Sequence, residues 1–328
     1  MDFDSLFDSF TKIKAAVIGD VMLDTYCWGH VERISPEAPV PVVTLDKREY
    51  RVGGAGNVAL NLASLCAEVT AFSVLGQDED AQVLSSLMEK NNIRTTGLIQ
   101  SASRKTTNKT RIISRNQQMI RLDSETTADL DPRDEELLLS KMQNFLSTEK
   151  PQVVILEDYN KGVLTQRVIT AVIQLCRQHG VATAVDPKKK NFFAFQGVDI
   201  FKPNLKEVRE GLNLPIEKVS IENLRNAHEL LLAKIHHGVS FITLSEHGVF
   251  YQAKEKSSII PAHFHNIADV SGAGDTVIAI ASLVYAATRD VQLMAEVANI
   301  GGGLVCEQVG TVAIDKSRLL AECKRLLH

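Results

Sequence analysis

Short apolar runs alternate with amphipathic segments along most of the chain. The apolar runs predict buried strands, at 15–19, 69–75, 153–156, 181–185, 200–202 and 239–244. Between several of them, apolar residues recur at helical spacing and predict helices, at 80–90, 134–147 and 165–179. Alternating strands and helices are typical of a doubly wound α/β fold with a mostly parallel sheet. We therefore expect a single α/β domain over residues 1–328.

Two segments depart from this pattern. Residues 26–52 contain alternating or β-rich pieces, and the prolines between positions 36 and 41 exclude a central helix. Residues 105–123 are β-prone and strongly basic. We expect these two segments to form a small β lid that covers a site on the main domain.

The composition indicates which kinds of binding partner to exclude. A net charge of -4 over 328 residues argues against binding to nucleic acid or to an anionic membrane, because both usually require a basic surface. The five cysteines are scattered and form no C-x-x-C pair, which is typical of a reduced cytosolic protein. Residues 1–14 lack the apolar core of a signal peptide or a membrane span, so we expect a cytoplasmic location.

The most informative motif is the glycine-rich turn at 269–276, which opens an apolar helix. Gly272, Ala273 and Gly274 would let backbone N–H groups converge where the unpaired donors and the dipole of a helix stabilise an anion. Asp275 stands in the same turn and could deprotonate a hydroxyl group. The alternative interpretation is a glycine turn whose aspartate caps the helix.

A second glycine motif opens a helix that runs to about residue 65. Gly54, Gly56 and Ala59 formally fit the dinucleotide fingerprint G-x-G-x-x-A. That fingerprint should follow a buried strand, whereas this one follows a charged segment. We interpret Gly53 and Gly54 as a close approach of the backbone to a polyol, with Asn57 providing hydrogen bonds.

Polar residues near strand ends add candidate ligands, because open parallel sheets bind ligands at the carboxyl ends of their strands. Asp24 could bind a sugar hydroxyl or could serve only a turn. Asp158 and Lys161 follow a later strand. Asn204 and Glu207 are three positions apart at a helix start, so they could share a hydrated Mg²⁺ or form a capping box.

The basic segment at 105–123 contains a candidate phosphate site. Lys109 and Arg111 lie two positions apart, so a strand would place them on one face, where the pair could hold a phosphate already present on a substrate. The alternative is a solvated charged face.

Three consecutive glycines interrupt an apolar helical segment near the end of the chain. Gly301, Gly302 and Gly303 lower helicity and indicate that something approaches the helix closely. The approaching group could be a nucleotide base or a packed helix.

Three motifs in this order resemble those of the ribokinase-type (PfkB) carbohydrate kinases over essentially the whole chain. They are Gly53-Gly54 with Asn57, Asn204 with Glu207, and Val270-Ser271-Gly272-Ala273-Gly274-Asp275. The resemblance implies a ribokinase-like doubly wound domain with a small β-sheet lid. It also implies ATP as co-substrate, Mg²⁺ as cofactor and phosphoryl transfer to a sugar hydroxyl.

A finer resemblance rests on residues 33–43, 114–118 and 120–123. They are similar to the D-glycero-D-manno-heptose 7-phosphate kinases of lipopolysaccharide-core synthesis, which phosphorylate the anomeric 1-hydroxyl. Many of those enzymes are fused to a nucleotidyltransferase, so the chain resembles the stand-alone kinase or the kinase half. Ser271 stands where threonine is usual, and Glu157 stands where the heptose kinases commonly have serine.

Carried over by position, the resemblance gives the candidate residues their roles. Asp275 would be the general base, with Gly272, Ala273 and Gly274 forming the anion hole. The sugar phosphate would be bound by Asp24, Arg33, Gly53, Gly54, Asn57, Lys109, Arg111, Asp158 and Lys161, with Arg33, Lys109 and Arg111 addressing the 7-phosphate. ATP would be bound by Asn204, Glu207, Thr243, Ser245, Gly248 and Asn299. Asn204 and Glu207 would also position Mg²⁺ through water.

Two other functions remain open from the residues. A kinase of the same type could act on ribose, fructose or a hexose phosphate. A catalytically silent sugar-binding regulator could use the same fold, because a fold does not determine function. In either case a lid with exposed strand edges predicts a homodimer formed through the lid.

Overall fold

A large, mostly parallel sheet forms the centre of the protein. The computed structural model describes residues 2–115, 117–263, 267–308 and 310–327. Nine of the described strands form this sheet, in the order β13-β12-β11-β10-β9-β8-β1-β4-β5. The parallel strands are β1 Lys14–Gly19, β4 Glu68–Gly76, β5 Ile93–Ser101, β8 Val153–Glu157, β9 Ala182–Asp186, β10 Ile200–Phe201 and β11 Val239–Thr243. Two antiparallel strands complete one edge, β12 Val249–Ala253 and β13 Lys256–Ile260.

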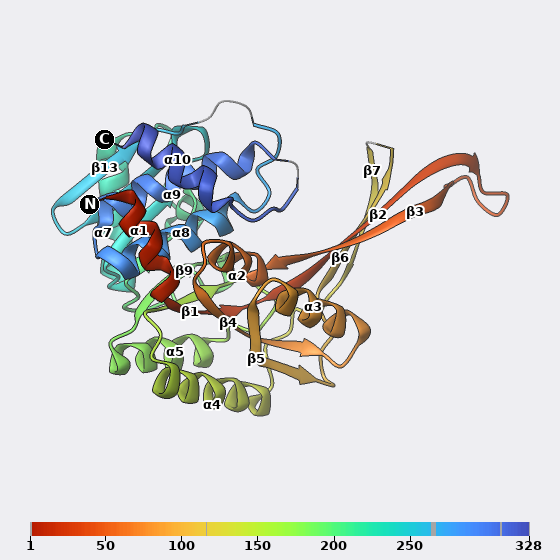
Figure 1. Cartoon of the computed structure of the whole chain (residues 1–328), viewed down its shortest axis with the longest axis horizontal. Coiled ribbons are helices and arrows are strands. Elements are labelled where there is room, and N and C mark those ends of the chain that lie inside the picture. Colours follow the sequence, from red (N-terminus) through yellow and green to blue (C-terminus); the bar gives the residue numbers. More distant parts are fainter. Residues whose placement is uncertain (1, 116, 264–266, 309, 328) are drawn as a thin grey trace.

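Helices cover both faces of the large sheet (Figure 1). One core lies beneath α1 Phe3–Ser9, α2 Ala55–Ser64, α3 Glu79–Lys90, α8 Ala273–Thr288, α9 Val291–Cys306 and α10 Lys316–Leu326. The other lies beneath α4 Pro132–Glu149, α5 Gln166–His179, α6 Leu205–Leu212 and α7 Ile221–Ile235. Alternate residues of β1 point into the two cores. Ala15 and Val17 belong to the first core, and Ala16 and Ile18 belong to the second. The predicted doubly wound α/β fold is therefore confirmed.

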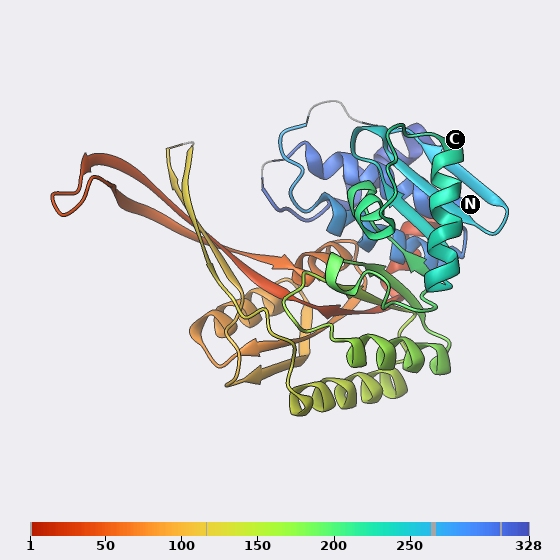
Figure 2. The same ribbon diagram turned by 180° about the vertical axis from the view of Figure 1, so that it is seen from behind.

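A second, smaller sheet projects from the main domain (Figure 1 and Figure 2). Its order is β3-β2-β6-β7, with β2 Val21–Ile34, β3 Pro41–Gly54, β6 Asn108–Ser114 and β7 Gln117–Ser124. Strands β2 and β3 pair antiparallel, as do β6 and β7, whereas β2 and β6 are parallel. Strand β2 starts two residues after β1 ends, so the second sheet is anchored at the carboxyl edge of the large sheet.

Two elements have weak signals in the sequence. Helix α1 is only seven residues long, although Leu6 and Phe7 are buried. Strand β5 lies at the edge of the large sheet, where exposed and partly buried polar residues interrupt its apolar positions. Among the described residues, no helix is both long enough and apolar enough to cross a membrane.

Candidate functional site

The glycine-rich turn leads directly into helix α8. Gly272 has a φ of 79°, in the left-handed region, and α8 begins at the next residue, Ala273. Oδ1 of Asp269 accepts hydrogen bonds from the backbone N–H of Ser271 at 2.9 Å and from its hydroxyl at 2.8 Å, which fixes the turn. The first N–H groups of a helix have no partner within the helix, so this turn presents donors of the kind that bind anions.

Asp275 lies buried in the first turn of α8, held by two donors. Asn57 Nδ2 donates to Oδ2 at 2.7 Å, and the Tyr159 hydroxyl donates to Oδ1 at 2.7 Å. Burial raises the pKa of Asp275 to about 6, although the hydrogen bonds from Asn57 and Tyr159 lower it. A carboxylate with a pKa close to neutral can accept a proton from a hydroxyl group under physiological conditions.

The second glycine motif places Asn57 against this aspartate. Gly54 has a φ of 58°, and a Cβ there would lie 2.3 Å from the carbonyl oxygen of Asp20. A Cβ at Gly53 would lie 2.4 Å from Oδ2 of Asp24, so neither position has room for a side chain. The turn starts α2, whose Asn57 is fully buried and reaches Asp275. Asn57, for which a sugar hydroxyl is the predicted partner, also donates a hydrogen bond to the candidate base.

Three buried carboxylates meet next to the turn. One oxygen from each of Glu157, Asp186 and Asp275 lies within 4.8 Å of the other two. Asp186 is compensated, because Oδ1 accepts from Lys188 Nζ at 2.8 Å and Oδ2 accepts from Lys202 Nζ at 2.7 Å. These two ammonium groups keep the pKa of Asp186 below its ordinary value, despite its burial.

Glu157 has no such compensation. It is 0% exposed, and neither carboxylate oxygen has a hydrogen-bond partner among the described residues. Burial, with Asp186 and Asp275 nearby, raises the pKa of Glu157 well above its ordinary value. Glu157 could therefore hold a proton, or contribute an oxygen ligand to a cation shared with its neighbours.

Asn204 and Glu207 form a capping box at the start of α6. Asn204 Oδ1 accepts from the Glu207 N–H at 2.8 Å, and Glu207 Oε2 accepts from the Asn204 N–H at 2.7 Å. Glu207 Oε1 accepts from Lys188 Nζ at 3.0 Å. The Lys188 side chain therefore bridges Glu207 and Asp186. Asn204 and Glu207 carry amide and carboxylate oxygens, which are ligands of the type that Mg²⁺ prefers.

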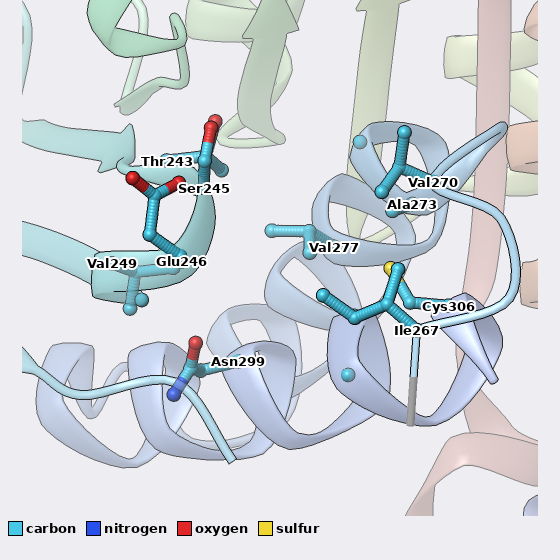
Figure 3. A pocket seen from close by; sticks show the side chains of 14 residues that line it. Thr243, Ser245, Glu246, Val249, Ile267, Val270, Ala273, Val277, Asn299 and Cys306 are labelled. Atoms are coloured by element: carbon cyan, nitrogen blue, oxygen red, sulfur yellow. The ribbon is translucent and has the colours of Figure 1, made fainter. Parts of the chain in front are cut away.

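A cavity of about 290 Å³ opens beside α8 and α9 (Figure 3). Four of the six residues predicted to bind ATP line it, namely Thr243, Ser245, Gly248 and Asn299, whereas Asn204 and Glu207 do not. Its walls also include residues that the sequence did not single out, namely Glu246, Val249, Ile267, Val277 and Cys306. Ala273 and Gly274 line the same cavity, so the candidate anion hole and the predicted nucleotide site are continuous.

The glycines of α9 lie where α9 packs against α8 and beside the cavity. A Cβ at Gly301 would lie 2.1 Å from Cδ1 of Ile280, and one at Gly302 would lie 2.6 Å from Cγ2 of Val277. Both partners belong to α8, so the glycines let the two helices approach closely. Gly302 and Gly303 also line the cavity.

The candidate basic ligands are paired with carboxylates at the base of the second sheet. Arg111 Nη1 donates to Asp24 Oδ1 at 2.6 Å and to the carbonyl oxygen of Lys109 at 3.1 Å. Lys109 Nζ and Lys161 Nζ both donate to Glu125, at 3.4 and 2.7 Å. The structure thus brings together these candidate ligands from β2, β6 and the loop after β8.

Asp158 and Arg33 have different surroundings. Asp158 accepts hydrogen bonds from the Asn160 N–H at 2.8 Å and from Asn191 Nδ2 at 3.1 Å, and burial raises its pKa to about 6. Arg33 is exposed and lies nine positions beyond Asp24 on β2, or roughly 30 Å along an extended strand. Within one chain, Arg33 is therefore remote from Lys109 and Arg111.

Asp20 is a site residue that is absent from the candidates predicted from the sequence. It is 2% exposed and accepts from the backbone N–H groups of Tyr159, Lys161 and Val163 at 2.9, 3.0 and 3.1 Å. Its position at the end of β1 was the available signal. Asp20 fixes the loop that delivers Tyr159 to Asp275.

Known proteins are similar to this chain over nearly its whole length. The sequence model of the pfkB family carbohydrate kinases matches residues 12–317. The chain is 37% identical over 324 residues to the bifunctional protein HldE of Geotalea uraniireducens, which covers 98% of this chain and 65% of that protein. The HldE protein of Syntrophotalea carbinolica is also 37% identical, over 97% of this chain and 64% of its own length. The chain thus spans just under two thirds of the length of these relatives.

Solved structures share the fold at low sequence identity. Phosphofructokinase-2 from Escherichia coli, in complex with potassium, has a TM-score of 0.78 and 17% identity, over 95% of this chain and all of that chain. Arabidopsis thaliana ribokinase, complexed with ribose and ATP, has a TM-score of 0.72 and 15% identity, over 94% of this chain and 98% of that chain.

Proposed function

Because the chain belongs to the pfkB family of carbohydrate kinases, we propose that it phosphorylates the 1-hydroxyl of D-glycero-D-manno-heptose 7-phosphate with ATP, as a step of lipopolysaccharide-core synthesis. The observation that carries the proposal is the position of Asp275, buried in the first turn of α8 and bound by two donors. The heptose is favoured over other sugars by the similarity to HldE proteins.

In the proposed reaction, the 1-hydroxyl of the sugar attacks the γ-phosphorus of ATP in line with the leaving group. Asp275 accepts the proton of that hydroxyl, and the oxygen–phosphorus bond to ADP breaks. The backbone N–H groups at the start of α8 face the phosphoryl group and stabilise its negative charge. Lys202 Nζ and Oδ2 of Asp186, its ion-pair partner, both lie 3.7 Å from where a Cβ of Gly274 would be, so the ammonium group adjoins the turn with its charge compensated by Asp186.

Magnesium fits the oxygen-rich donors near this turn. Asn204 and Glu207 would hold the ion through water, and Glu157 has buried carboxylate oxygens without a donor among the described residues. When bound, the ion would neutralise part of the charge of the triphosphate. The nucleotide itself would occupy the cavity lined by Thr243, Ser245 and Asn299.

The second sheet would bind the sugar phosphate. Asp24 would accept hydrogen bonds from sugar hydroxyls, while Lys109, Arg111 and Lys161 would address the 7-phosphate. In the free protein their charges are compensated by Asp24, Asp123 and Glu125. Binding of a phosphate would therefore exchange these ion pairs for contacts with the ligand.

A substrate screen tests this proposal. ADP release would be measured with heptose 7-phosphate, unphosphorylated heptose, ribose, fructose and fructose 6-phosphate. We expect kcat/KM to be highest for heptose 7-phosphate, and Lys109→Ala to raise KM for phosphorylated sugars only. A preference for an unphosphorylated sugar would contradict the proposal. Sugar binding without ADP release would instead indicate a silent regulator.

We also infer that two copies associate through the second sheet. It exposes large apolar side chains on β2, β3, β7 and the β2–β3 loop, namely Ile34, Val40, Leu45, Met119, Ile120 and Leu122. Such residues on a projecting sheet are typical of a protein interface. Analytical ultracentrifugation should show a dimer that Ile120→Lys dissociates, whereas Leu137→Lys, on exposed α4, should leave it intact.

A further inference from the structure

Tyr159 is the second of the two donors that hold Asp275. Its hydroxyl lies 2.7 Å from Oδ1 of Asp275, while Asn57 occupies Oδ2. Each carboxylate oxygen has about two acceptor positions, so one remains on each oxygen after these hydrogen bonds form. The two donors thus fix the carboxylate while leaving it able to accept from a substrate hydroxyl.

The loop that carries Tyr159 is anchored independently of Asp275. Asp20 accepts hydrogen bonds from the backbone N–H groups of Tyr159, Lys161 and Val163. Arg104 adds bonds to the carbonyl oxygens of Ala128, at 2.9 Å, and of Lys161. The backbone of Tyr159 is therefore held by the scaffold, independently of the aspartate.

We propose that Tyr159 is a positioning residue for the proposed base, and that the hydrogen bond from its hydroxyl fixes the orientation of the Asp275 carboxylate. This inference rests on the proposed function, since it assigns Asp275 the role of base. A hydrogen bond to a carboxylate stabilises the charged form, so it opposes the effect of burial.

The surroundings of Tyr159 keep it a donor. Burial and the carboxylates of Asp275, Glu157 and Asp186 raise the pKa of Tyr159 well above its ordinary value. Lys188 Nζ lies 5.6 Å from the centre of the ring. The phenol consequently remains protonated at neutral pH.

The charged groups around Asp275 come from several elements. Glu157 of β8 and Asp186 of β9 are negative when ionised, and Lys202 follows β10. Asp186 raises the pKa of Asp275, and Lys202 lowers it. The pH dependence attributed to Tyr159 therefore has to be measured as a difference between variants in which all of these groups are retained.

Tyr159→Phe removes the hydroxyl and keeps the ring. We expect kcat for heptose 7-phosphate to fall by roughly tenfold to a hundredfold, because a misplaced catalytic group costs about that much. KM for ATP should stay nearly unchanged. In the pH profile of kcat/KM, the apparent pKa on the acid side should rise by about half to one pH unit. Tyr285→Phe, ten residues beyond Asp275 on α8, is the matched control. It should leave kcat and the pH profile of kcat/KM unchanged.

A second measurement does not need activity. Carboxyl ¹³C NMR titration of the nucleotide-free protein, with the Asp275 signal assigned by its loss in Asp275→Asn, should give a higher pKa for Asp275 in Tyr159→Phe. An unchanged pKa overturns the inference, as does a fall in kcat with an unmoved apparent pKa on the acid side of the kcat/KM profile. If wild type phosphorylates no sugar while the NMR shift is present, the proposed function fails and the contact between Tyr159 and Asp275 stands.

Discussion

Lys202 Nζ lies 2.7 Å from Oδ2 of Asp186, and both side chains are almost completely buried. Removing one partner of a buried pair leaves a charge without full compensation. Lys202→Met should therefore lower the free energy of unfolding by about 3 kcal/mol, measured by urea denaturation. Lys206→Met, on the exposed side of α6, should change it by less than about 0.5 kcal/mol. Equal stability of both variants would show that Lys188 alone compensates Asp186.

Asp275→Asn tests the assignment of the base. The variant keeps the size of the side chain but cannot accept the proton, so kcat should fall by about a thousandfold or more. ATP binding, followed by calorimetry, and the melting temperature should change little. Asp8→Asn, at an exposed position of α1, should retain the wild-type rate. A near-normal rate for Asp275→Asn would require a different base.

Glu157→Gln should stabilise the protein at alkaline pH. The pKa of Glu157 is raised on folding from an ordinary value of 4.5, so its contribution is complete below about pH 4.5 and is lost as the pH rises toward the folded-state pKa. Glutamine resembles the protonated acid and has no such loss. The melting temperature of the variant should exceed that of wild type by at least about 2 °C at pH 8, and the difference should shrink at pH 5.

The matched control is Glu229→Gln, at an exposed position of α7. It should leave the melting temperature unchanged at both pH values. A Glu157→Gln variant that melts below wild type at pH 8 would mean that Glu157 is ionised and compensated in the folded protein.

A buried histidine should make the fold sensitive to acid. His237 shares the hydroxyl of Ser240 with His228, at 2.6 and 2.9 Å, and burial lowers the pKa of His237 from 6.5 to about 3. The unfolded chain therefore binds a proton below pH 6.5 that the folded chain does not bind, and stability falls as the pH drops from 6.5 toward 3. At pH 5 the loss from His237 should be about 2 kcal/mol.

Urea denaturation at pH 7.5 and pH 5 would measure this loss. His237→Phe should reduce the difference between the two pH values. The control His179→Gln, at the exposed end of α5, should keep the wild-type difference. An undiminished difference in His237→Phe would exclude His237 as its source.

Most strands and helices could be predicted because buried positions require apolar residues, and these recur with the period of the strand or helix. Strand β8 is apolar from Val153 to Leu156, since helices cover both faces of the sheet there, and the predicted strand at 153–156 matches the observed one except for Glu157. Strand β5 gave no comparable signal, because polar residues stand between its buried ones. The left-handed Gly272 and the capping box of Asn204 likewise follow from short motifs.

The hydrogen-bond partners of Asp275 could not be predicted from local sequence. Asn57 and Asp275 are 218 positions apart, and Tyr159 is 116 positions from Asp275. Their residue types indicated polar roles, but only the packing of α2 against α8 directs Asn57 to the aspartate. The isolation of Arg33 follows from the length of β2, which local sequence does not determine.

The anchoring of the Tyr159 loop by Asp20 affects how the protein is made. Asp20 is synthesised early, yet its third donor, Val163, follows 143 positions later. The hydrogen bond from Asn57 to Asp275 closes a still longer stretch of chain. Contacts between such distant positions form late, because the entropy of closing long loops opposes them. The site combines residues from Asp20 to Asp275, so it can be complete only after most of the chain has left the ribosome.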